Sequence, residues 1–242
     1  MLGRQVKAEW IKLRSVRSTW LLVGLGVLGI IVQSVTALAT GASTAHEESL
    51  NVMSASGLTV VFVTILGVIA AASEYSQGSV ITTYTAVSRR WAPLFGKAIV
   101  VAALGVALGV LSVPLSRLVA AIWFGLGSGN WDANVSAAVH YGVGTTIALV
   151  GFAALGVMIG TLARSPAIGV AVAFFFLFVL DSILGSISVY SEYSFTGILQ
   201  SLGDPNQREG REPLFGSAIA LLAFYVAVLG AITATIELRR DV

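Results

Sequence analysis

Long apolar runs separated by short polar stretches form the main pattern of this chain. No charged residue occurs between residues 18 and 45, between 50 and 73, or between Lys97 and Arg117. The hydrocarbon core of a bilayer is about 30 Å thick, and a helix needs about 20 apolar residues to cross it. Each of these runs is therefore long enough for one membrane-spanning helix.

The pattern predicts an all-α polytopic membrane protein, a single transmembrane domain over residues 1–242 with six spans. Pro114 marks a kink or the start of an irregular segment in the third span, and residues 118–131 continue it as an interfacial element. Residues 187–212 are too polar to cross. The expected spans are 19–40, 52–73, 95–117, 137–162, 166–187 and 213–236.

Residues 1–18 form a predicted amphipathic helix that lies in the membrane interface. Basic residues, Lys12 and Arg14 among them, fall largely off its apolar face. Glu9 falls inside that face, and it either pairs with Lys12 three residues on or reaches a neighbouring subunit. The apolar positions recur at spacings of four and three residues: Leu2, Val6, Trp10, Leu13 and Val16.

Composition and charge support a membrane location. The chain is 56% hydrophobic and 11% charged, whereas a soluble domain carries about 25% charged residues. Of the 14 Lys and Arg residues, eleven lie in the N-terminal helix, the 73–97 loop, the turn at Arg164 and the C-terminal tail. The positive-inside rule therefore places both termini and the 73–97 loop in the cytoplasm of a multi-pass protein. We expect it in a bacterial plasma membrane.

The sequence carries no complete catalytic motif. Gly96-Lys97 is not a P-loop, because Trp91 stands at the position of the upstream glycine and Ala98 follows the lysine. His46-Glu47 lacks the second histidine of a zinc protease. With no cysteine in the chain, disulfides, iron–sulfur clusters and thiolate zinc sites are excluded. The chain is expected to be no enzyme by itself and to hold no metal.

Two charges fall within or near the predicted spans, Arg117 and Asp181. A charge inside a span indicates a functional site. Either Asp181 pairs with Arg117 or lines a polar cavity, or each side chain reaches the outer interface independently. The G-x-x-x-G pairs Gly105/Gly109 and Gly156/Gly160 favour close helix packing within the bundle, and a subunit interface is the alternative.

The polar loop 73–97 separates two long apolar runs. Its residues 80–87 are uncharged and rich in β-branched side chains, yet too few to cross a membrane. Gly78 and the Arg89-Arg90 pair bound this stretch. A short helix lying on the cytoplasmic surface fits it best.

Three short stretches carry a family resemblance, and one of them is the closing Arg239-Arg240-Asp241-Val242. Glu9-Trp10-Ile11-Lys12-Leu13-Arg14-Ser15, near the N-terminus, resembles the start of type-2 ATP-binding-cassette (ABC) exporter permeases, especially actinobacterial ones. Glu74-Tyr75-x-x-Gly78-Ser79, followed by Arg89-Arg90 and Lys97, is similar to that family's loop between the second and third spans. Two positions depart from the pattern: Ser79 stands where threonine is common, and Ser88 where proline often precedes the basic pair.

The resemblance implies a partner and a division of labour. The interfacial helix and a coupling helix in the loop would dock onto a separate nucleotide-binding ATPase subunit, which would hold the ATP and Mg. A second permease subunit, identical or different, and membrane lipid are the other expected partners, with no nucleic acid. An extracellular re-entrant segment would precede the sixth span. The implied coupling positions are Glu74, Tyr75, Gly78, Ser79, Arg89 and Arg90, and those of the interfacial helix are Glu9, Trp10, Lys12 and Arg14.

The implied function is outward transport of an amphiphilic, lipid-like, peptide or drug substrate, driven by that ATPase. A secondary carrier or channel is one alternative, which midplane acids and broken spans would favour; within the predicted spans, Asp181 is the acid that stands out. A membrane sensor or scaffold without transport is another. Stimulation of ATPase activity by a substrate would separate the exporter from the scaffold.

Overall fold

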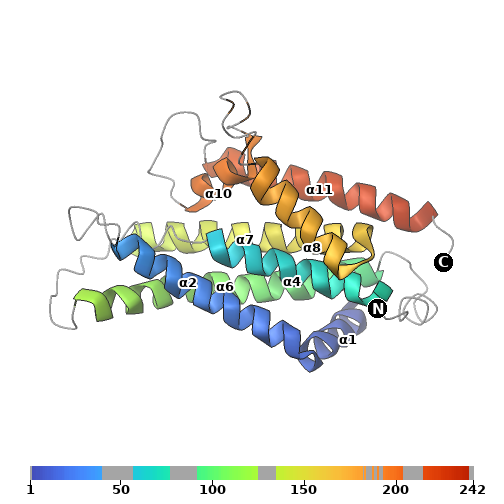
Figure 1. Ribbon diagram of the computed structural model, residues 1–242, viewed down its shortest axis with the longest axis horizontal. Coiled ribbons are helices and arrows are strands. Elements are labelled where there is room, and N and C mark those ends of the chain that lie inside the picture. The colour runs from blue at the N-terminus through green and yellow to red at the C-terminus, as the bar shows by residue number, and fades with distance from the viewer. Residues whose placement is uncertain are drawn as a thin grey trace.

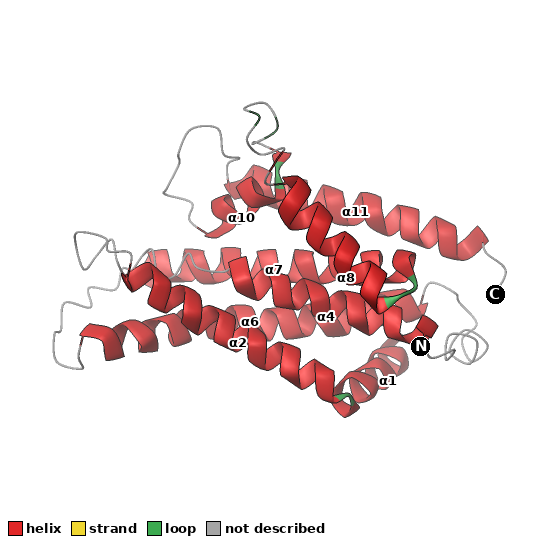
Figure 2. Ribbon diagram, in the orientation of Figure 1, coloured by secondary structure: helices red, strands yellow, loops and turns green. Residues whose placement is uncertain are grey.

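The computed structural model describes residues 2–39, 57–76, 92–124, 135–181, 183, 187, 190, 193–203 and 215–239. These residues are helical apart from short connections, and no strand occurs among them (Figure 2). The predicted segment 80–87 lies wholly outside this part of the chain, and so does the second half of the segment 118–131. The helices are α1 (Leu2–Ser15), α2 (Arg17–Ala39), α4 (Gly57–Ser76), α6 (Ala92–Phe124), α7 (Val135–Ala163), α8 (Pro166–Phe174), the π-helix η1 (Phe175–Leu180), α10 (Phe195–Gly203) and α11 (Phe215–Arg239).

Five of the described helices are long and apolar enough to cross a membrane: α2, α4, α6, α7 and α11. The chain is therefore a multi-pass membrane protein. The predicted fifth span, 166–187, is instead a shorter apolar helix, α8, that continues as the π-helix η1. The structure thus supports five spans directly, and a sixth crossing rests on whether α8 and η1 together traverse the bilayer.

The long helices run side by side, with α4 and α7 the most buried and α11 the least (Figure 1). α8 crosses this layer obliquely and leads to the short helix α10, which packs on α7 and α11. α1 leaves α2 at a sharp angle at the break between Ser15 and Arg17 and packs mainly on α6 (Figure 1). The result places α1, the end of α4, the start of α6, the α7–α8 turn and the end of α11 at one end of the bundle (Figure 1).

Glycines let the central helices approach at backbone distance. A Cβ atom added to Gly156 would collide with the carbonyl oxygen of Thr64 on α4, and one added to Gly160 would collide with that of Val68. On α4, a Cβ at Gly67 would lie 2.6 Å from the carbonyl oxygen of Ala153. The prediction that the Gly156/Gly160 pair packs within the bundle is confirmed.

α6 continues without a break through Pro114 to Phe124. Proline removes one helical hydrogen bond, here the one to the Val110 carbonyl, and membrane helices tolerate this loss. One turn before the proline, the Ser112 hydroxyl donates to the neighbouring Gly109 carbonyl at 2.6 Å. Of the two alternatives predicted at Pro114, a kink or the start of an irregular segment, the second is wrong, and the helix extends the third span beyond its predicted end at residue 117.

Candidate functional site

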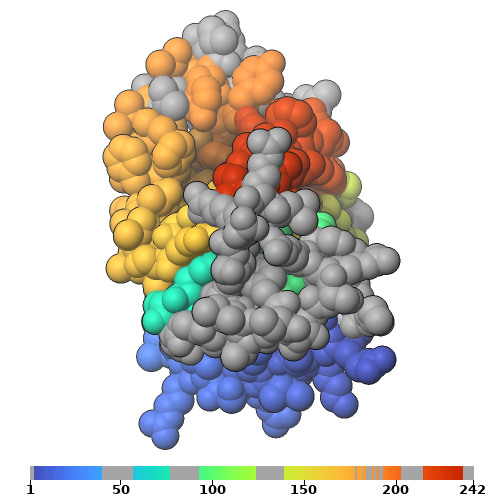
Figure 3. Space-filling model, turned by 90° about the vertical axis from the view of Figure 1, so that its right-hand side faces the viewer, coloured from blue at the N-terminus to red at the C-terminus, as the bar shows by residue number. Residues whose placement is uncertain are grey.

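Four charged side chains meet at the end of the bundle where α1, α4 and α6 converge. They are Glu9, Lys12, Glu74 and Lys97, and we call them the charge cluster. Viewed from this end, α1 forms one border of the molecular face, while α8 and α11 lie toward the opposite border (Figure 3). The cluster thus stands where the chain leaves α4 and re-enters the bundle at α6.

Glu74 lies at the centre of the charge cluster. Its side chain, in the last turns of α4, is buried. Lys12 of α1 donates a hydrogen bond to its Oε1 at 2.8 Å, and Lys97 of α6 donates to its Oε2. Because each carboxylate oxygen accepts a hydrogen bond from a lysine of a different helix, the Glu74 side chain links α4 to both α1 and α6.

Glu9 of α1 is the second carboxylate of the charge cluster and balances the second lysine. Its carboxylate is buried and accepts a hydrogen bond from Lys12 at 3.0 Å. The predicted pairing of Glu9 with Lys12 is confirmed. Its burial has a packing reason: a Cβ at Gly96 of α6 would lie 3.1 Å from Gln5 and 3.5 Å from Glu9, so α1 rests directly on α6.

Lys12 remains charged at neutral pH. Burial lowers the pKa of a lysine, but the hydrogen bonds to Glu74 and Glu9 outweigh it and hold the pKa of Lys12 above its ordinary value of 10.5. Two carboxylates and two ammonium groups therefore balance. A buried pair that loses one partner leaves an uncompensated charge, which costs about 3–5 kcal/mol.

A second contact joins α4 to the α7–α8 turn. The Arg164 guanidinium lies 5.3 Å from the centre of the Tyr75 ring, within the range of a cation–π interaction. Arg164 has a φ of 56°, a left-handed conformation that favours glycine. Its backbone N–H donates to the Gly160 carbonyl at 3.1 Å, closing α7. The turn thus holds a strained arginine whose side chain lies over Tyr75.

A cavity of about 440 Å³ opens beside the charge cluster. Ser73, Ser76 and Pro166 line it together with all four members. Among the described residues no group of three or more His, Cys, Asp or Glu residues is arranged to hold a metal. The paired charges offer neither a free nucleophile nor an unpaired base, so the arrangement is suited to joining helices.

The remaining predicted residues of this region fall in two groups. Trp10 and Arg14 of α1 are exposed, and the Arg14 carbonyl accepts a hydrogen bond from the Trp20 indole at 3.0 Å. The buried face of α1 is formed by Glu9 and Leu13 instead of Trp10. The other predicted coupling positions lie outside the described residues: Gly78, Ser79, Arg89 and Arg90.

Asp181 and Arg117 are not brought together. The buried Asp181 carboxylate accepts hydrogen bonds from the backbone N–H groups of Phe195 and Thr196, each at 2.8 Å, and from the Thr196 hydroxyl at 2.7 Å. These groups form the start of α10, so Asp181 caps a helix from a distance in sequence. Nε and Nη2 of Arg117 are buried and have no hydrogen-bond partner among the described residues. The hypothesis of an Asp181–Arg117 pair is therefore not what the structure shows.

Sequence reasoning missed two contributors, Lys97 as the partner of Glu74 and Arg164 as the partner of Tyr75. A signal for the first was present. Glu74 and Lys97 stand at the two ends of one loop between antiparallel spans, so both had to lie at the same membrane surface. The second depends on the geometry of the α7–α8 turn, which no local pattern indicates.

The family comparison covers the region just described. A family model described as "ABC-2 family transporter protein" matches residues 5–180, which include the whole charge cluster. No curated protein and no solved structure matches the chain.

Proposed function

The chain belongs to the ABC-2 transporter family, and from this membership and the charge cluster we propose how it works as a permease. As a member of that family it is a membrane component of an ABC transporter, working with an ATP-binding partner subunit. The proposal is that the partner drives export by pushing on the 73–97 loop. The observation that carries it is the position of Glu74, which is bonded to both α1 and α6 where that loop begins.

The charge cluster supports a mechanical role for the loop. Lys97 of α6 is bonded to Glu74 of α4, so the two ends of the loop are tied together. A force on the loop then moves both helices as one unit. α4 and α6 each pack on α7. The helices meet at glycines, where their backbones are in close contact, so one helix cannot move far without the other. Movement at the surface would thereby reach the middle of the bundle.

Within this proposal the predicted coupling residues have different roles. Glu74 is buried and acts as a positioning residue that holds the loop, with Lys12 and Lys97 as its partners. Gly78, Ser79, Arg89 and Arg90 are the proposed contacts of the ATPase subunit. Tyr75, next to Glu74, would pass movement to the α7–α8 turn through Arg164.

The same proposal includes the other subunits of the transporter and the orientation of the chain in the membrane. The ATPase subunit binds the ATP and Mg, and a second permease subunit completes the transporter in a bacterial plasma membrane. α8 and η1 make a sixth crossing, so both termini and the charge cluster lie in the cytoplasm. α10 then forms part of an extracellular re-entrant segment, and the substrate is an amphiphilic molecule moved outward.

The test is copurification and ATPase coupling in a membrane-reconstituted complex. The chain is expected to bring down a stoichiometric subunit bearing a P-loop, and a transported amphiphile is expected to stimulate its ATP hydrolysis. Glu74→Gln should retain the partner but lose most of the stimulation. Lys7→Gln, on the exposed face of α1, is the matched control and should behave as wild type.

Two results would contradict the proposal. Absence of any ATPase subunit, under conditions that keep other membrane complexes intact, favours a carrier or a scaffold. A Glu74→Gln variant that is folded and fully stimulated shows that force does not pass through the charge cluster.

A further inference from the structure

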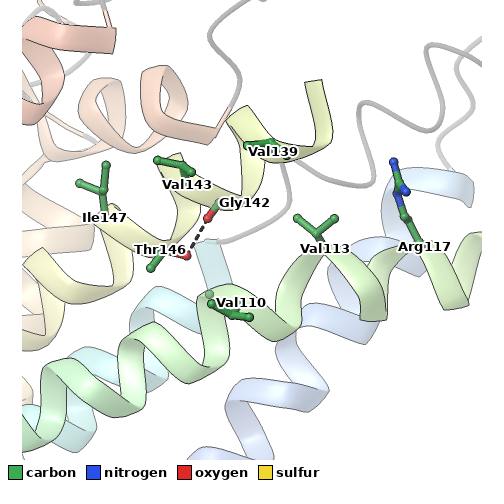
Figure 4. A pocket seen from close by; sticks show the side chains of 9 residues that line it. Val110, Val113, Arg117, Val139, Gly142, Val143, Thr146 and Ile147 are labelled. Carbon is green, nitrogen blue, oxygen red and sulfur yellow. Dashed lines mark hydrogen bonds between the residues drawn. The ribbon is translucent and has the colours of Figure 1, made fainter. Parts of the chain in front are cut away.

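An apolar groove runs between α6 and α7, away from the charge cluster. Its volume is about 500 Å³. Arg117 lies on the same continuous helix as Lys97, 20 residues further along, which corresponds to about 30 Å. Arg117 therefore stands at the opposite surface of the membrane. Figure 4 shows it and Ile147 at opposite ends of the groove.

Below Arg117 the groove offers apolar surface. Val110 and Val139 are 63% and 59% exposed, and Val143 is 47% exposed. The hydroxyl of Thr146 is already engaged, since it donates to the Gly142 carbonyl at 2.6 Å (Figure 4). This part of the groove is therefore suited to binding a hydrocarbon chain, and Thr146 does not need a polar partner from a ligand.

Arg117 places one positive charge at the end of this apolar surface. Its Nε and Nη2 atoms are buried and have no hydrogen-bond partner among the described residues. Buried donors of a charged group are costly to leave unpaired. The guanidinium also presents its donors in a fixed geometry that matches a phosphate or a carboxylate. An anionic group beside Arg117 would remove this cost.

The length of the groove matches a single lipid chain. On α6 it extends from Gly109 to Arg117, eight residues further along, which corresponds to about 12 Å along the helix axis. One leaflet contributes about 15 Å of hydrocarbon to the bilayer core. A chain anchored at Arg117 would thus lie in the groove over most of its leaflet.

We propose that the α6–α7 groove is a binding site for an anionic phospholipid of the leaflet opposite the charge cluster. The headgroup phosphate accepts hydrogen bonds from Arg117, and one acyl chain lies along Val110, Val113, Val139 and Val143. The charge complementarity and the leaflet-length apolar surface select this occupant. The site is independent of the proposed export and holds whether or not the chain transports a substrate.

The experiment uses the full chain in detergent micelles, with a phosphatidylglycerol analogue that carries a photoreactive diazirine in its acyl chain. After irradiation, peptide mapping locates the label. We expect labelling of the 105–124 and 135–150 peptides that unlabelled phosphatidylglycerol suppresses at least about tenfold better than phosphatidylcholine with the same chains, the scale of a charge-assisted hydrogen bond. Arg117→Gln should abolish this preference, and Arg117→Lys should restore part of it.

Two further variants keep the result specific. Val143→Phe fills the groove without a change of charge and should reduce labelling by both lipids. Arg14→Gln removes an exposed cation at the other end of the bundle and should leave labelling of the two peptides unchanged. Asp132→Asn removes the acid nearest to Arg117 in the sequence and should also leave it unchanged.

Several outcomes would overturn the proposal. Equal suppression by the two lipids, or an Arg117→Gln variant that keeps the preference, shows that Arg117 does not select an anion. Increased labelling in Asp132→Asn shows that this acid neutralises Arg117 within the chain. A disulfide between two copies of a Val143→Cys variant shows that a second copy occupies the groove.

Discussion

Glu74 shows how a single residue organises the end of the bundle. A carboxylate has two oxygen atoms, and here each accepts a hydrogen bond from a lysine of a different helix. The sequence indicates that Glu74 lies at the exit of a span, but its partners depend on how α1 folds back and on where α6 begins. The sequence places Glu74 and Lys97 at the same membrane surface, but the bond from Lys12 depends on tertiary packing, so that second partner could not be predicted from the pattern.

Removing Lys97 should cost more than removing the whole ion pair. Lys97→Met leaves Glu74 buried with one of its two cations, and we expect a loss of about 3 kcal/mol in the free energy of unfolding. The double variant Glu74→Gln/Lys97→Met leaves no uncompensated carboxylate there and should lose less. Thermal unfolding in detergent measures both. If the double variant is as unstable as the sum of the single ones, the two side chains act independently.

The docking of α1 should be insensitive to pH over the physiological range. The raised pKa of Lys12 means that its ion pairs contribute fully below the ordinary lysine value of 10.5 and are lost as the pH rises through the higher folded-state pKa. An environment-sensitive label on a Ser15→Cys variant reports release of α1, because the chain has no native cysteine. A release midpoint above about 10.5 is expected. Release near pH 8, or an unchanged midpoint in Lys12→Gln, would contradict this assignment.

At the scale of the helices, the apolar runs predicted which segments form the long membrane helices. The uncharged runs correspond to α2, α4, α6, α7 and α11, because burial in lipid leaves helices as the available structure for a single crossing segment. The order of packing did not follow from the sequence. The glycine pairs pointed to close contacts, yet which helix each glycine meets is decided by the three-dimensional arrangement.

Gly160 gives the sharpest test of that arrangement. Gly160→Ala places a Cβ against the Val68 carbonyl of α4, and a collision with backbone forces the helices apart, with an expected loss of at least about 2 kcal/mol. Gly24→Ala is the matched control, since nothing lies within 4 Å of its added Cβ. The control should be neutral or gain up to about 1 kcal/mol from helix propensity. Equal unfolding temperatures for the two variants would rule out the close α4–α7 contact.

Asp181 is a second residue that the sequence singled out but whose partner, the start of α10, it did not indicate. We expect Asp181→Ala to release the start of α10, with a loss of about 1–2 kcal/mol that is local to this helix. Hydrogen exchange of the Phe195 and Thr196 amides measures the effect, and the α4 amides serve as the internal control. Thr196→Val removes one of the three hydrogen bonds and should give a smaller increase. Unchanged exchange at α10 in Asp181→Ala would show that the cap contributes nothing.

At the scale of the whole molecule, α8 and η1 determine the number of membrane crossings. Their fifteen residues, Pro166 to Leu180, span about 22 Å as a helix, less than the roughly 30 Å of a bilayer core. The arrangement of the bundle nevertheless favours a crossing. α8 begins at the end that holds the charge cluster and leads toward α10, which lies over the half of α7 away from that end, and α11 returns from there (Figure 1). The start of α10 is bonded to Asp181, the residue that follows η1, and α10 packs on α7 and α11.

Single-cysteine labelling decides between five and six crossings. We expect Ser165→Cys to react with a membrane-impermeant maleimide only after permeabilisation of cells, and Tyr193→Cys, at an exposed position, to react in intact cells. Ser76→Cys and Gly216→Cys report the two ends of the bundle independently and should follow Ser165 and Tyr193 respectively. The expected pattern requires α8 and η1 to cross, because nothing else in the chain connects residues 165 and 193. If Tyr193→Cys is protected along with Ser165→Cys, the α8–η1 segment re-enters from the cytoplasm. The chain then has five crossings, and the arrangement of α11 in Figure 1, with its end on the side of the charge cluster, would be contradicted as well.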